Sequence, residues 1–544
     1  MKRLLLITLL CSVFTVNAQL REAVANSVWQ GEGGLRSLDE FDNKIFFSSS
    51  SNQASYRAII MADGMVGNIL SLRETNSNRS LWNTNNTVNF YEYNSEWYFE
   101  AFEYAYNLPV TMKIYKLPSS STRYADIVFN LTGVTGSTAS RFLEPVHLND
   151  KLVFSPLSVT GGTGVEPYVI DFSNTANNGL LLDIENGTGS SDPSYFTVVN
   201  NKIIFAATDT ANGRELWETD GTSGGTQLFA NINFGNGSSD PDEFTVLGSS
   251  MLFAATNAVT GRELFITDGT VSGTTMVKNI NVGNPDSNPS NLKTIGSEVY
   301  FSADDGINGQ EFWKSDGTDI GTILVKDINT TGNSNPNNFV QLGSDVFFTA
   351  DDGVNGIELW KTDGTGTGTL LVKDINSSGD SNPRLLTEYN GKIYFIAADD
   401  TNIENLWVSD GTSLGTMVIT SAQSNGFSLT EDLLVFNNEI YFNYIAPGAS
   451  GNGTLYAYHD PALSTTDFQL NENTVSLFPN PTNNYFEIQS KEMLTKVEVY
   501  SLQGQLVKSF LPQNRYDISE LSNGMYFINI QANGNSISKR LIKQ

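Results

Sequence analysis

The stretch ELWKTDGTGTGT, residues 358–369, occurs five times in the chain in nearly the same form. The other copies are RELWETDGTSGGT at 214–226, RELFITDGTVSGT at 262–274, QEFWKSDGTDIGT at 310–322 and NLWVSDGTSLGT at 405–416. The aspartates of the DGT triplets stand at 220, 268, 316, 363 and 410, so successive spacings are 48, 48, 47 and 47 residues. A period this constant indicates a repeat architecture.

One unit contains the pattern of two β-hairpins. RLLTEY (384–389) and KIYFIAA (392–398) flank an Asn-Gly dipeptide, which is suited to a two-residue hairpin turn. LWVS (406–409) and TMVIT (416–420) flank the DGT turn. In that turn we expect the aspartate to accept hydrogen bonds from N–H groups just ahead and the glycine to adopt a positive φ. Four short strands per unit predict a β-propeller blade, and a right-handed β-solenoid is the alternative.

A large aromatic residue stands at the same place in each clear unit, and we expect it to pack as a wedge between neighbouring blades. These residues are Trp217, Phe265, Trp313, Trp360 and Trp407. Weaker copies flank the five clear units, with strands that contain Phe47, Phe99, Phe154 and Phe442. The sequence therefore predicts nine candidate units between about residue 35 and residue 460. We predict an all-β, propeller-like array of about 8–9 blades.

Charge and composition narrow the functional classes. The 544 residues include 59 acidic and 31 basic side chains, which gives a net charge of −28. This excess of negative charge argues against a nucleic-acid partner. Cys11 is the single cysteine, and the two histidines are His147 and His459. The chain therefore has too few cysteines and histidines for us to expect thiol catalysis or a His-rich zinc site.

The N-terminus has the three-part pattern of a secretory signal. Lys2 and Arg3 precede the apolar run LLLITLLCSVF, and Val16-Asn17-Ala18 supplies compact residues before Gln19. We expect cleavage after residue 18, with no transmembrane segment in the mature chain.

Two family resemblances follow from these residues. The words ELWKTDGTGTGT and LLVKDIN resemble the bacterial ELWxxDGT repeat family, most strongly over residues 183–420. The C-terminal words SLFPNPTNNYFEI, KVEVYSLQGQLVKSF and YDISELSNGMYFINIQANGNSISKRLIK resemble the type A sorting domain of the type IX secretion system. This second resemblance implies a small β-sandwich that is read by the secretion machinery, and a protein that passes through the periplasm to the cell surface or the medium.

The expected organisation has four parts. They are a signal peptide at 1–18, the repeat propeller at 19–460, a polar linker at 461–474 and the sorting domain at 475–544. In the tail, EVYS with LVKSF and MYFINIQ with SISKRLI predict two hairpins.

Two loops are rich in oxygen ligands of the kind that calcium accepts. The candidates, separated by glycines, are Asp304, Asp305, Asn308, Glu311, Asp351, Asp352, Asn355 and Glu358. Their spacing differs from that of an EF-hand, and Asx turns between strands are the alternative interpretation. Calcium is the one candidate cofactor that the sequence suggests.

No catalytic constellation is recognisable in the chain, because neither histidine has an evident nucleophile and no pair of acids stands out. The leading interpretation is a secreted, non-enzymatic binding or adhesion module with a surface glycan or a protein as ligand. Its specificity is expected on the first three, irregular units, which include FYEYNSEWYFEAFEYAYN at 90–107. The alternative is a carbohydrate-active propeller enzyme, a glycoside hydrolase or polysaccharide lyase, which would need two acids at one mouth.

Overall fold

The computed structural model describes residues 164–419 without interruption. Before them it describes 19–24 and the separate strands between 35 and 156, and after them 433–444, 454–459 and most of 475–544. The expected signal peptide (1–18) and linker (461–474) lie outside the described residues. Leu20–Tyr458 forms one compact unit and His459–Gln544 belongs to another, so each is described by itself.

The five clear repeats each form one four-stranded antiparallel sheet. Their strands are β16 (Ser194–Val199), β17 (Lys202–Asp209), β18 (Gly213–Thr219) and β19 (Gln227–Ala230); β20 (Asp242–Leu247), β21 (Ser250–Asn257), β22 (Gly261–Thr267) and β23 (Thr275–Lys278); β24 (Ser290–Ile295), β25 (Glu298–Asp304), β26 (Gln310–Ser315) and β27 (Ile323–Lys326); β28 (Asn337–Leu342), β29 (Asp345–Asp351), β30 (Ile357–Thr362) and β31 (Leu370–Lys373); and β32 (Arg384–Tyr389), β33 (Lys392–Ala398), β34 (Glu404–Ser409) and β35 (Met417–Val418). The predicted pairs of hairpins are confirmed, and each sheet follows chain order.

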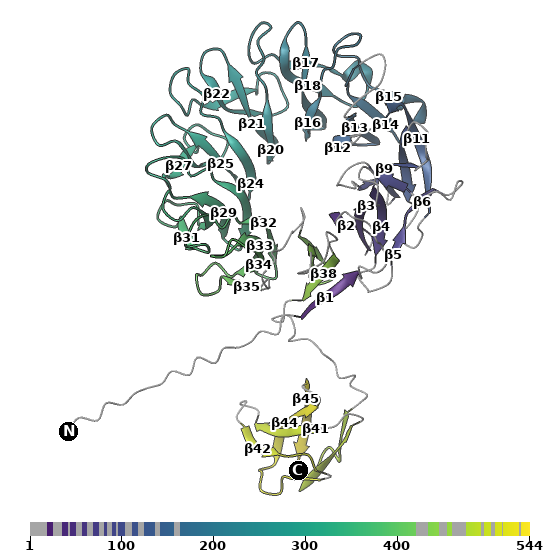
Figure 1. The fold of residues 1–544 in the computed structure, drawn as a ribbon, viewed down its shortest axis with the longest axis vertical. Coiled ribbons are helices and arrows are strands. Elements are labelled where there is room, and N and C mark those ends of the chain that lie inside the picture. Colours follow the sequence, from purple (N-terminus) through teal and green to yellow (C-terminus); the bar gives the residue numbers. More distant parts are fainter. Residues whose placement is uncertain are drawn as a thin grey trace, which may run out of the picture. The chain divides into compact units, whose positions relative to one another are not determined.

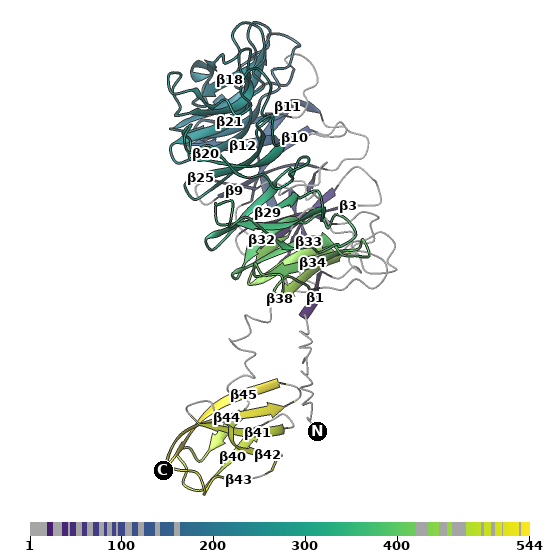
Figure 2. The same cartoon turned by 90° about the vertical axis from the view of Figure 1, so that its left-hand side faces the viewer.

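The sheets of the larger unit follow one another around a ring. Figure 1 shows the first strand of each repeat, such as β20 and β24, on the inner side, and later strands, such as β22 and β27, on the outer side. Seen from the side in Figure 2, successive sheets stack face to face. This is the arrangement of a β-propeller, as predicted.

The weaker repeats also form sheets. The repeat that contains Phe154 gives a four-stranded sheet of β12 (Phe142–Leu148), β13 (Lys151–Pro156), β14 (Tyr168–Asp171) and β15 (Gly179–Leu180). The repeats that contain Phe47 and Phe99 are joined into one ten-stranded sheet, because β7 (Leu81–Asn83) pairs with both β4 (Arg57–Ala62) and β9 (Glu96–Glu103). Its other strands are β2 (Leu35–Phe41), β3 (Lys44–Ser50), β5 (Ile69–Ser71), β6 (Arg73–Glu74), β8 (Phe90–Tyr93), β10 (Thr111–Leu117) and β11 (Tyr124–Thr135).

One sheet combines the two ends of the propeller. Strand β1 (Gln19–Val24) pairs with β38 (Thr454–His459), and the order continues through β37 (Glu439–Tyr444) to β36 (Leu434–Phe436). We call this sheet the closing sheet. Strand β2 contacts β36 and β37 on one side of it. On the other side, the ring of Tyr458 lies 6.0 Å from that of Tyr394 in β33.

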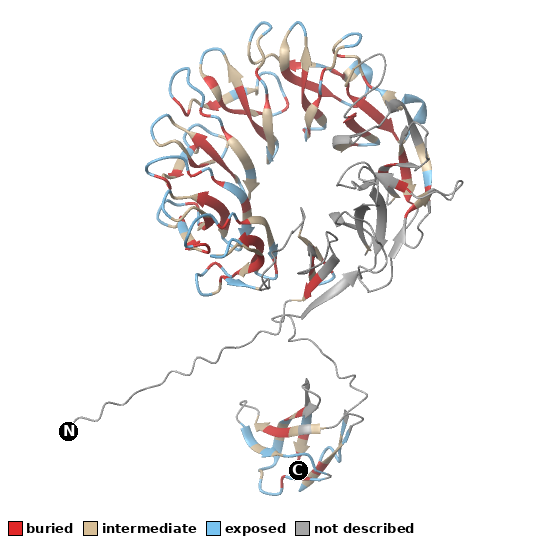
Figure 3. Ribbon diagram, in the orientation of Figure 1, coloured by how far each residue is buried: buried red, intermediate tan, exposed pale blue. Residues whose placement is uncertain are grey.

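The core lies between the sheets. The aromatic residue expected as a wedge is 5–8% exposed in each clear repeat, at Trp217, Phe265, Trp313, Trp360 and Trp407. Each lies in an apolar cluster with residues of the preceding sheet, as Trp313 does with Leu252 and Leu264. Figure 3 shows buried segments along the middle strands and exposed residues in the loops. The predicted role of these aromatics is confirmed.

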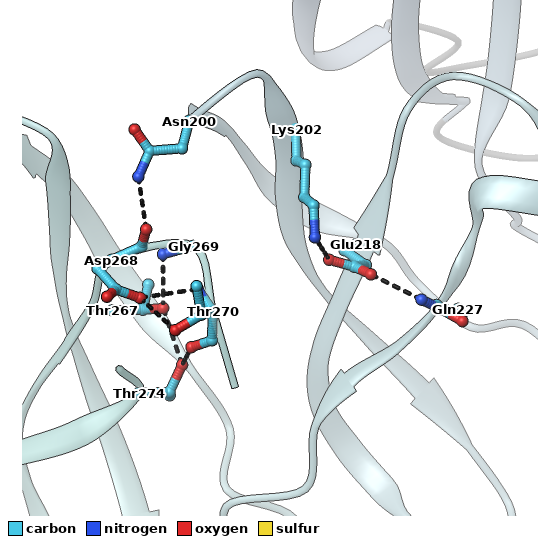
Figure 4. A network of polar contacts seen from close by, with 9 residues as sticks. All are labelled: Asn200, Lys202, Glu218, Gln227, Thr267, Asp268, Gly269, Thr270 and Thr274. Atoms are coloured by element: carbon cyan, nitrogen blue, oxygen red, sulfur yellow. Dashed lines mark hydrogen bonds and ion pairs between the residues drawn. The ribbon is translucent and has the colours of Figure 1, made fainter. Parts of the chain in front are cut away.

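The DGT triplet forms the turn that the sequence predicts. In one copy, Oδ1 of Asp268 accepts hydrogen bonds from the backbone N–H of Thr270 at 2.8 Å and from its hydroxyl at 2.6 Å, and Gly269 has φ of 82°. The Nδ2 of Asn200, in the preceding repeat, donates to the backbone oxygen of Asp268 at 2.5 Å (Figure 4). The turn therefore also links neighbouring blades.

The C-terminal unit is a small two-sheet sandwich. One sheet has the order β39 (Val475–Phe478), β40 (Tyr485–Ser490), β43 (Tyr516–Asp517), and the other has β42 (Leu506–Phe510), β41 (Leu494–Ser501), β44 (Gly524–Ala532), β45 (Asn535–Lys543). Phe486 and Tyr516 from the first sheet share one buried core with Val497 and Ile528 from the second. Both predicted hairpins are present.

Candidate functional site

In four of the five clear repeats, the glutamate of the Glu-Leu-Trp-type motif is buried. It accepts hydrogen bonds from the segment that leads to the next blade. Glu358 is fully buried, and its carboxylate accepts hydrogen bonds from the N–H groups of Ile375 at 3.0 Å, Asn376 at 3.4 Å and Ser381 at 3.1 Å. The hydroxyl of Ser381 donates to it at 2.6 Å. We call this arrangement the glutamate clamp. It holds the start of the next inner strand in place.

Burial raises the pKa of Glu358 from its ordinary 4.5 to about 7, against the effect of its four donors. The same clamp is formed by Glu166, Glu215, Glu263 and Glu311, each with a serine 23–25 residues further along the chain. In the fifth clear repeat Asn405 takes this position. Its Nδ2 donates to Asp399 and Ile403 within its own loop.

The serine of each glutamate clamp is the first residue of an SDP or SNP motif. The residue two places after the proline of this motif lies on a β-bulge that recurs in every clear repeat. The register of each inner strand shifts there, for example between Asn337 and Val340. The residue has a left-handed φ of 56–58° in all five clear repeats, at Tyr195, Glu243, Asn291, Asn338 and Leu385. A constant backbone conformation thus presents five positions at which the side chain changes from blade to blade.

Three of these bulges line one open cavity of about 360 Å³, which we call the amide groove. It is lined by residues 291–293, 337–340 and 385–386, from the inner strands β24, β28 and β32. The Nδ2 of Asn291 donates to the backbone oxygen of Pro336 at 3.1 Å, and that of Asn338 to Pro383 at 3.4 Å. No hydrogen bond to either Oδ1 is found among the described residues, so both can accept one from a ligand.

A second cavity, of about 350 Å³, adjoins the amide groove along the chain and is called the acidic pocket. It is lined by Asp242, Glu243, Arg262, 288–290, Gln310, Asn333 and Asn335. Arg262 and Asp242 form an ion pair. Burial nevertheless raises the pKa of Asp242 from 3.8 to about 6, with the neighbouring Glu243 adding to the shift. The pocket therefore contains two adjacent acids with a guanidinium.

The eight residues suggested for calcium have two different roles in the structure. Asp304 and Asp305 close Asx turns, since Asp304 accepts from Gly306 at 2.7 Å and Asp305 from Ile307 at 2.9 Å. Asp351 and Asp352 do the same in the next repeat, and Asn308 and Asn355 donate to Asp305 and Asp352. Glu311 and Glu358 are clamp residues. Among the described residues, no group of three or more His, Cys, Asp or Glu side chains is placed to hold a metal ion.

Hydrogen bonding dominates the electrostatics of these turns. Burial acts to raise the pKa of Asp305, but hydrogen bonds from Asn308 and Ile307 oppose it, and the pKa lies below its ordinary value. The same balance lowers the pKa of Asp352. Both carboxylates are therefore ionised at neutral pH.

Two aromatics of the stretch that the sequence suggested for binding are buried. In the stretch 90–107, Tyr98 and Phe99 are 5% and 0% exposed and belong to the core. His147 is half-buried, its ring lies 5.9 Å from that of Phe172, and burial lowers its pKa. These described side chains therefore pack into the fold; the two cavities above lie on the regular repeats, and a binding role of the first three units stays a prediction.

The tail is the part of the chain that a known family matches. Residues 476–544 match the family model described as a secretion system C-terminal sorting domain. In this tail, Asn480 of the Pro-Asn-Pro word donates to the backbone oxygen of Arg540 at 2.7 Å and accepts from the N–H of Ile542 at 2.9 Å. The Pro-Asn-Pro motif at the start of the domain is thus hydrogen-bonded to the basic C-terminal strand β45. The protein is exported by this route to the outer-membrane surface or the medium, and contact with the secretion machinery follows from it.

Several solved structures are distantly similar to this chain. They include a puromycin hydrolase (10% identity, 76% of this chain and 58% of that chain, TM-score 0.39). The β-propeller domain of the Trilobed protease from Pyrococcus furiosus is another (8% identity, 72% and 99%, TM-score 0.32), as is an uncharacterized protein from Listeria monocytogenes (11% identity, 65% and 97%, TM-score 0.32). The chain spans 58% of the length of the hydrolase. At these scores the likenesses carry no argument, and the fold rests on the sheet order given above.

A comparison with curated proteins found no match. Within the part of the chain that the structure describes, no helix is long and apolar enough to cross a membrane.

Proposed function

We propose that this exported propeller is a non-enzymatic binding module, serving adhesion, that takes a surface glycan in the amide groove. We further propose that its repeats belong to the ELWxxDGT family and that the chain divides into a signal peptide (1–18), a propeller (19–460), a linker (461–474) and a sorting domain (475–544). The observation that supports the binding role is that three bulge positions with different side chains, Asn291, Asn338 and Leu385, line one cavity.

The chemistry of the groove suits a hydroxylated ligand. Carboxamide oxygens of Asn291 and Asn338 accept from hydroxyl groups, and the exposed Lys293 can donate to them. Leu385 and Leu386 provide an apolar wall for the ring face of a sugar. The volume of about 360 Å³ lies in the range of small-ligand sites, roughly 300–1,000 Å³.

A glycan array probed with the secreted protein tests the proposal. The variant N291G/N338G removes both carboxamides, and glycine adopts the positive φ of these positions without strain. We expect loss of the glycan signal and a melting temperature only a few degrees lower, because the variant also loses the two hydrogen bonds that Asn291 and Asn338 donate to the backbone of the next repeat. Asn284→Ala, at an exposed position outside both cavities, is the matched control and should bind like the wild type. Equal binding by wild type and N291G/N338G would contradict this assignment.

The acidic pocket supports the second candidate, a carbohydrate-active enzyme. Asp242, with a pKa raised to about 6, can hold a proton near neutral pH, and Glu243 is the adjacent acid. A screen of polysaccharides for released products, repeated with Asp242→Asn, separates the two functions. Product formation that the substitution abolishes would favour the enzyme over the binding module.

A further inference from the structure

The four-stranded sheet of the sorting domain has one face on the core of that domain and one face that points away from it. Val497 and Val499 of β41, with Ile528 and Ile530 of β44, belong to the buried core that this sheet shares with the other one. Successive side chains of a strand point to opposite faces, so the residues between these stand on the outer face of the sheet. The side chains on this outer face decide what the tail can contact.

One row of side chains crosses the outer face from edge to edge. Tyr500 of β41 is paired with Leu506 of the edge strand β42 and with Phe527 of β44. Phe527 is in turn paired with Arg540 of the other edge strand, β45. Side chains paired in this way lie next to one another on one face, and strands about 4.8 Å apart make the row about 14 Å long. We call these four residues the outer row.

The outer row exposes apolar side chains beside a positive charge. Leu506 is 52% exposed and Phe527 is 41% exposed, and Arg540 is exposed as well. The guanidinium of Arg540 has no ion pair among the described residues of the tail. Adjacent exposed apolar side chains that end at a free cation are typical of a contact surface.

The neighbouring row of the same face is already occupied by contacts within the sheet. Glu498 is 6% exposed, forms an ion pair with Lys496 at 2.6 Å and accepts a hydrogen bond from the hydroxyl of Tyr500 at 3.2 Å. Its paired residues are Ser509 and Asn529. A partner on this row would have to break polar contacts and desolvate the groups that make them, which costs binding energy. The outer row is therefore the part of this face that is suited to a partner.

We propose that the outer row is the surface by which the secretion machinery recognises this tail. That the tail contacts the machinery follows from its family, and the proposal assigns the face that makes the contact. Tyrosine, phenylalanine and arginine are enriched in the cores of protein–protein interfaces. The complementary surface is that of a protein with an apolar hollow for Leu506 and Phe527 and an acidic group opposite Arg540. The assignment is independent of the function proposed for the propeller.

Export of the full chain in a host with the type IX apparatus tests this assignment. The variant L506T/F527T replaces both exposed apolar side chains by a polar residue that favours strands. We expect the fraction at the surface to fall about tenfold, with the protein held in the periplasm and its melting curve unchanged. S509T/N529T is the matched control, because it changes the same two strands on the same face one row away, and it should be exported like the wild type.

Arg540 provides a second arm that leaves the apolar side chains in place. R540E should lower the surface fraction by a similar factor, and R540K, which keeps the positive charge, should be exported like the wild type. Should L506T/F527T unfold the tail, R540E and R540K decide the question by the same measurement.

Three kinds of result would overturn the proposal. The first is normal export of a folded L506T/F527T or of R540E, or export of R540K as poor as that of R540E. The second is a lower melting temperature of the propeller in L506T/F527T, which would place the outer row against the propeller of the same chain. The third is a wild-type dimer that L506T/F527T converts to a monomer in sedimentation, which would place the row against a second copy.

Discussion

Replacing Glu358 by alanine tests whether the glutamate clamp holds the connection between two blades. The substitution removes a fully buried carboxylate and the four hydrogen bonds that it accepts from Ile375, Asn376 and Ser381. A hydrogen bond contributes about 1 kcal/mol net, and donors left buried without a partner add to the loss. We therefore expect the free energy of unfolding to fall by about 4 kcal/mol.

Urea denaturation and amide hydrogen exchange together measure this loss. Because repeats interact mainly with their neighbours, faster exchange should be confined to the segment around residues 375–382. Glu404→Ala is the matched control, since it removes a partly exposed ion pair with Arg384 and should cost less than about 1 kcal/mol. A loss below about 1 kcal/mol for E358A, with unchanged exchange in 375–382, would refute the clamp.

Four further outcomes are expected. Burial raises the pKa values of Glu263 and Glu358 from 4.5 to about 7. The stability that their protonation contributes is therefore fully present below pH 4.5 and is lost as the pH rises through about 7. Thermal melts across this range should show a weaker pH dependence of the melting temperature in E263Q/E358Q than in the wild type. Trp360→Ala should lower the free energy of unfolding by about 3–5 kcal/mol in denaturation experiments, because the indole packs between two sheets. Leu385→Asn should raise it by about 1 kcal/mol, since asparagine tolerates the φ of 56° better than leucine, and an unchanged denaturation midpoint would argue against backbone strain there. Deleting 475–544 should leave a folded propeller that stays in the periplasm, and cell fractionation would contradict this if the shortened protein reached the surface in normal amounts.

The local features of the fold could be predicted from the sequence. The Asn-Gly turn between β32 and β33 and the DGT turns depend on residues that are neighbours in the chain, and the structure places them as predicted. The fixed period likewise indicated one sheet per clear repeat. Such features are determined by backbone conformation and short-range hydrogen bonds, which a single sequence displays directly.

The features that depend on distant residues could not be predicted. Nothing in QLREAV (19–24) indicates that it pairs with a strand near residue 455, or that the units of Phe47 and Phe99 share one sheet. The left-handed bulge was also missed, because Tyr195 and Leu385 adopt it against their own preferences. The clamp did leave a signal: every glutamate in this position is followed 23–25 residues later by a serine that begins SDP or SNP.

The closing sheet has a consequence for the order in which this protein folds. Its first strand ends at Val24 and its partner begins at Thr454, so 430 positions (454 − 24) separate them. During synthesis, the backbone N–H and C=O groups of β1 that pair with β38 must remain without this partner until nearly the whole propeller has been made. Long-range pairing of this kind slows folding, and an unpaired strand is exposed to aggregation in the meantime. Ring closure therefore cannot begin before Thr454 has been made, and a helper protein that shields β1 until then would increase the yield of folded protein.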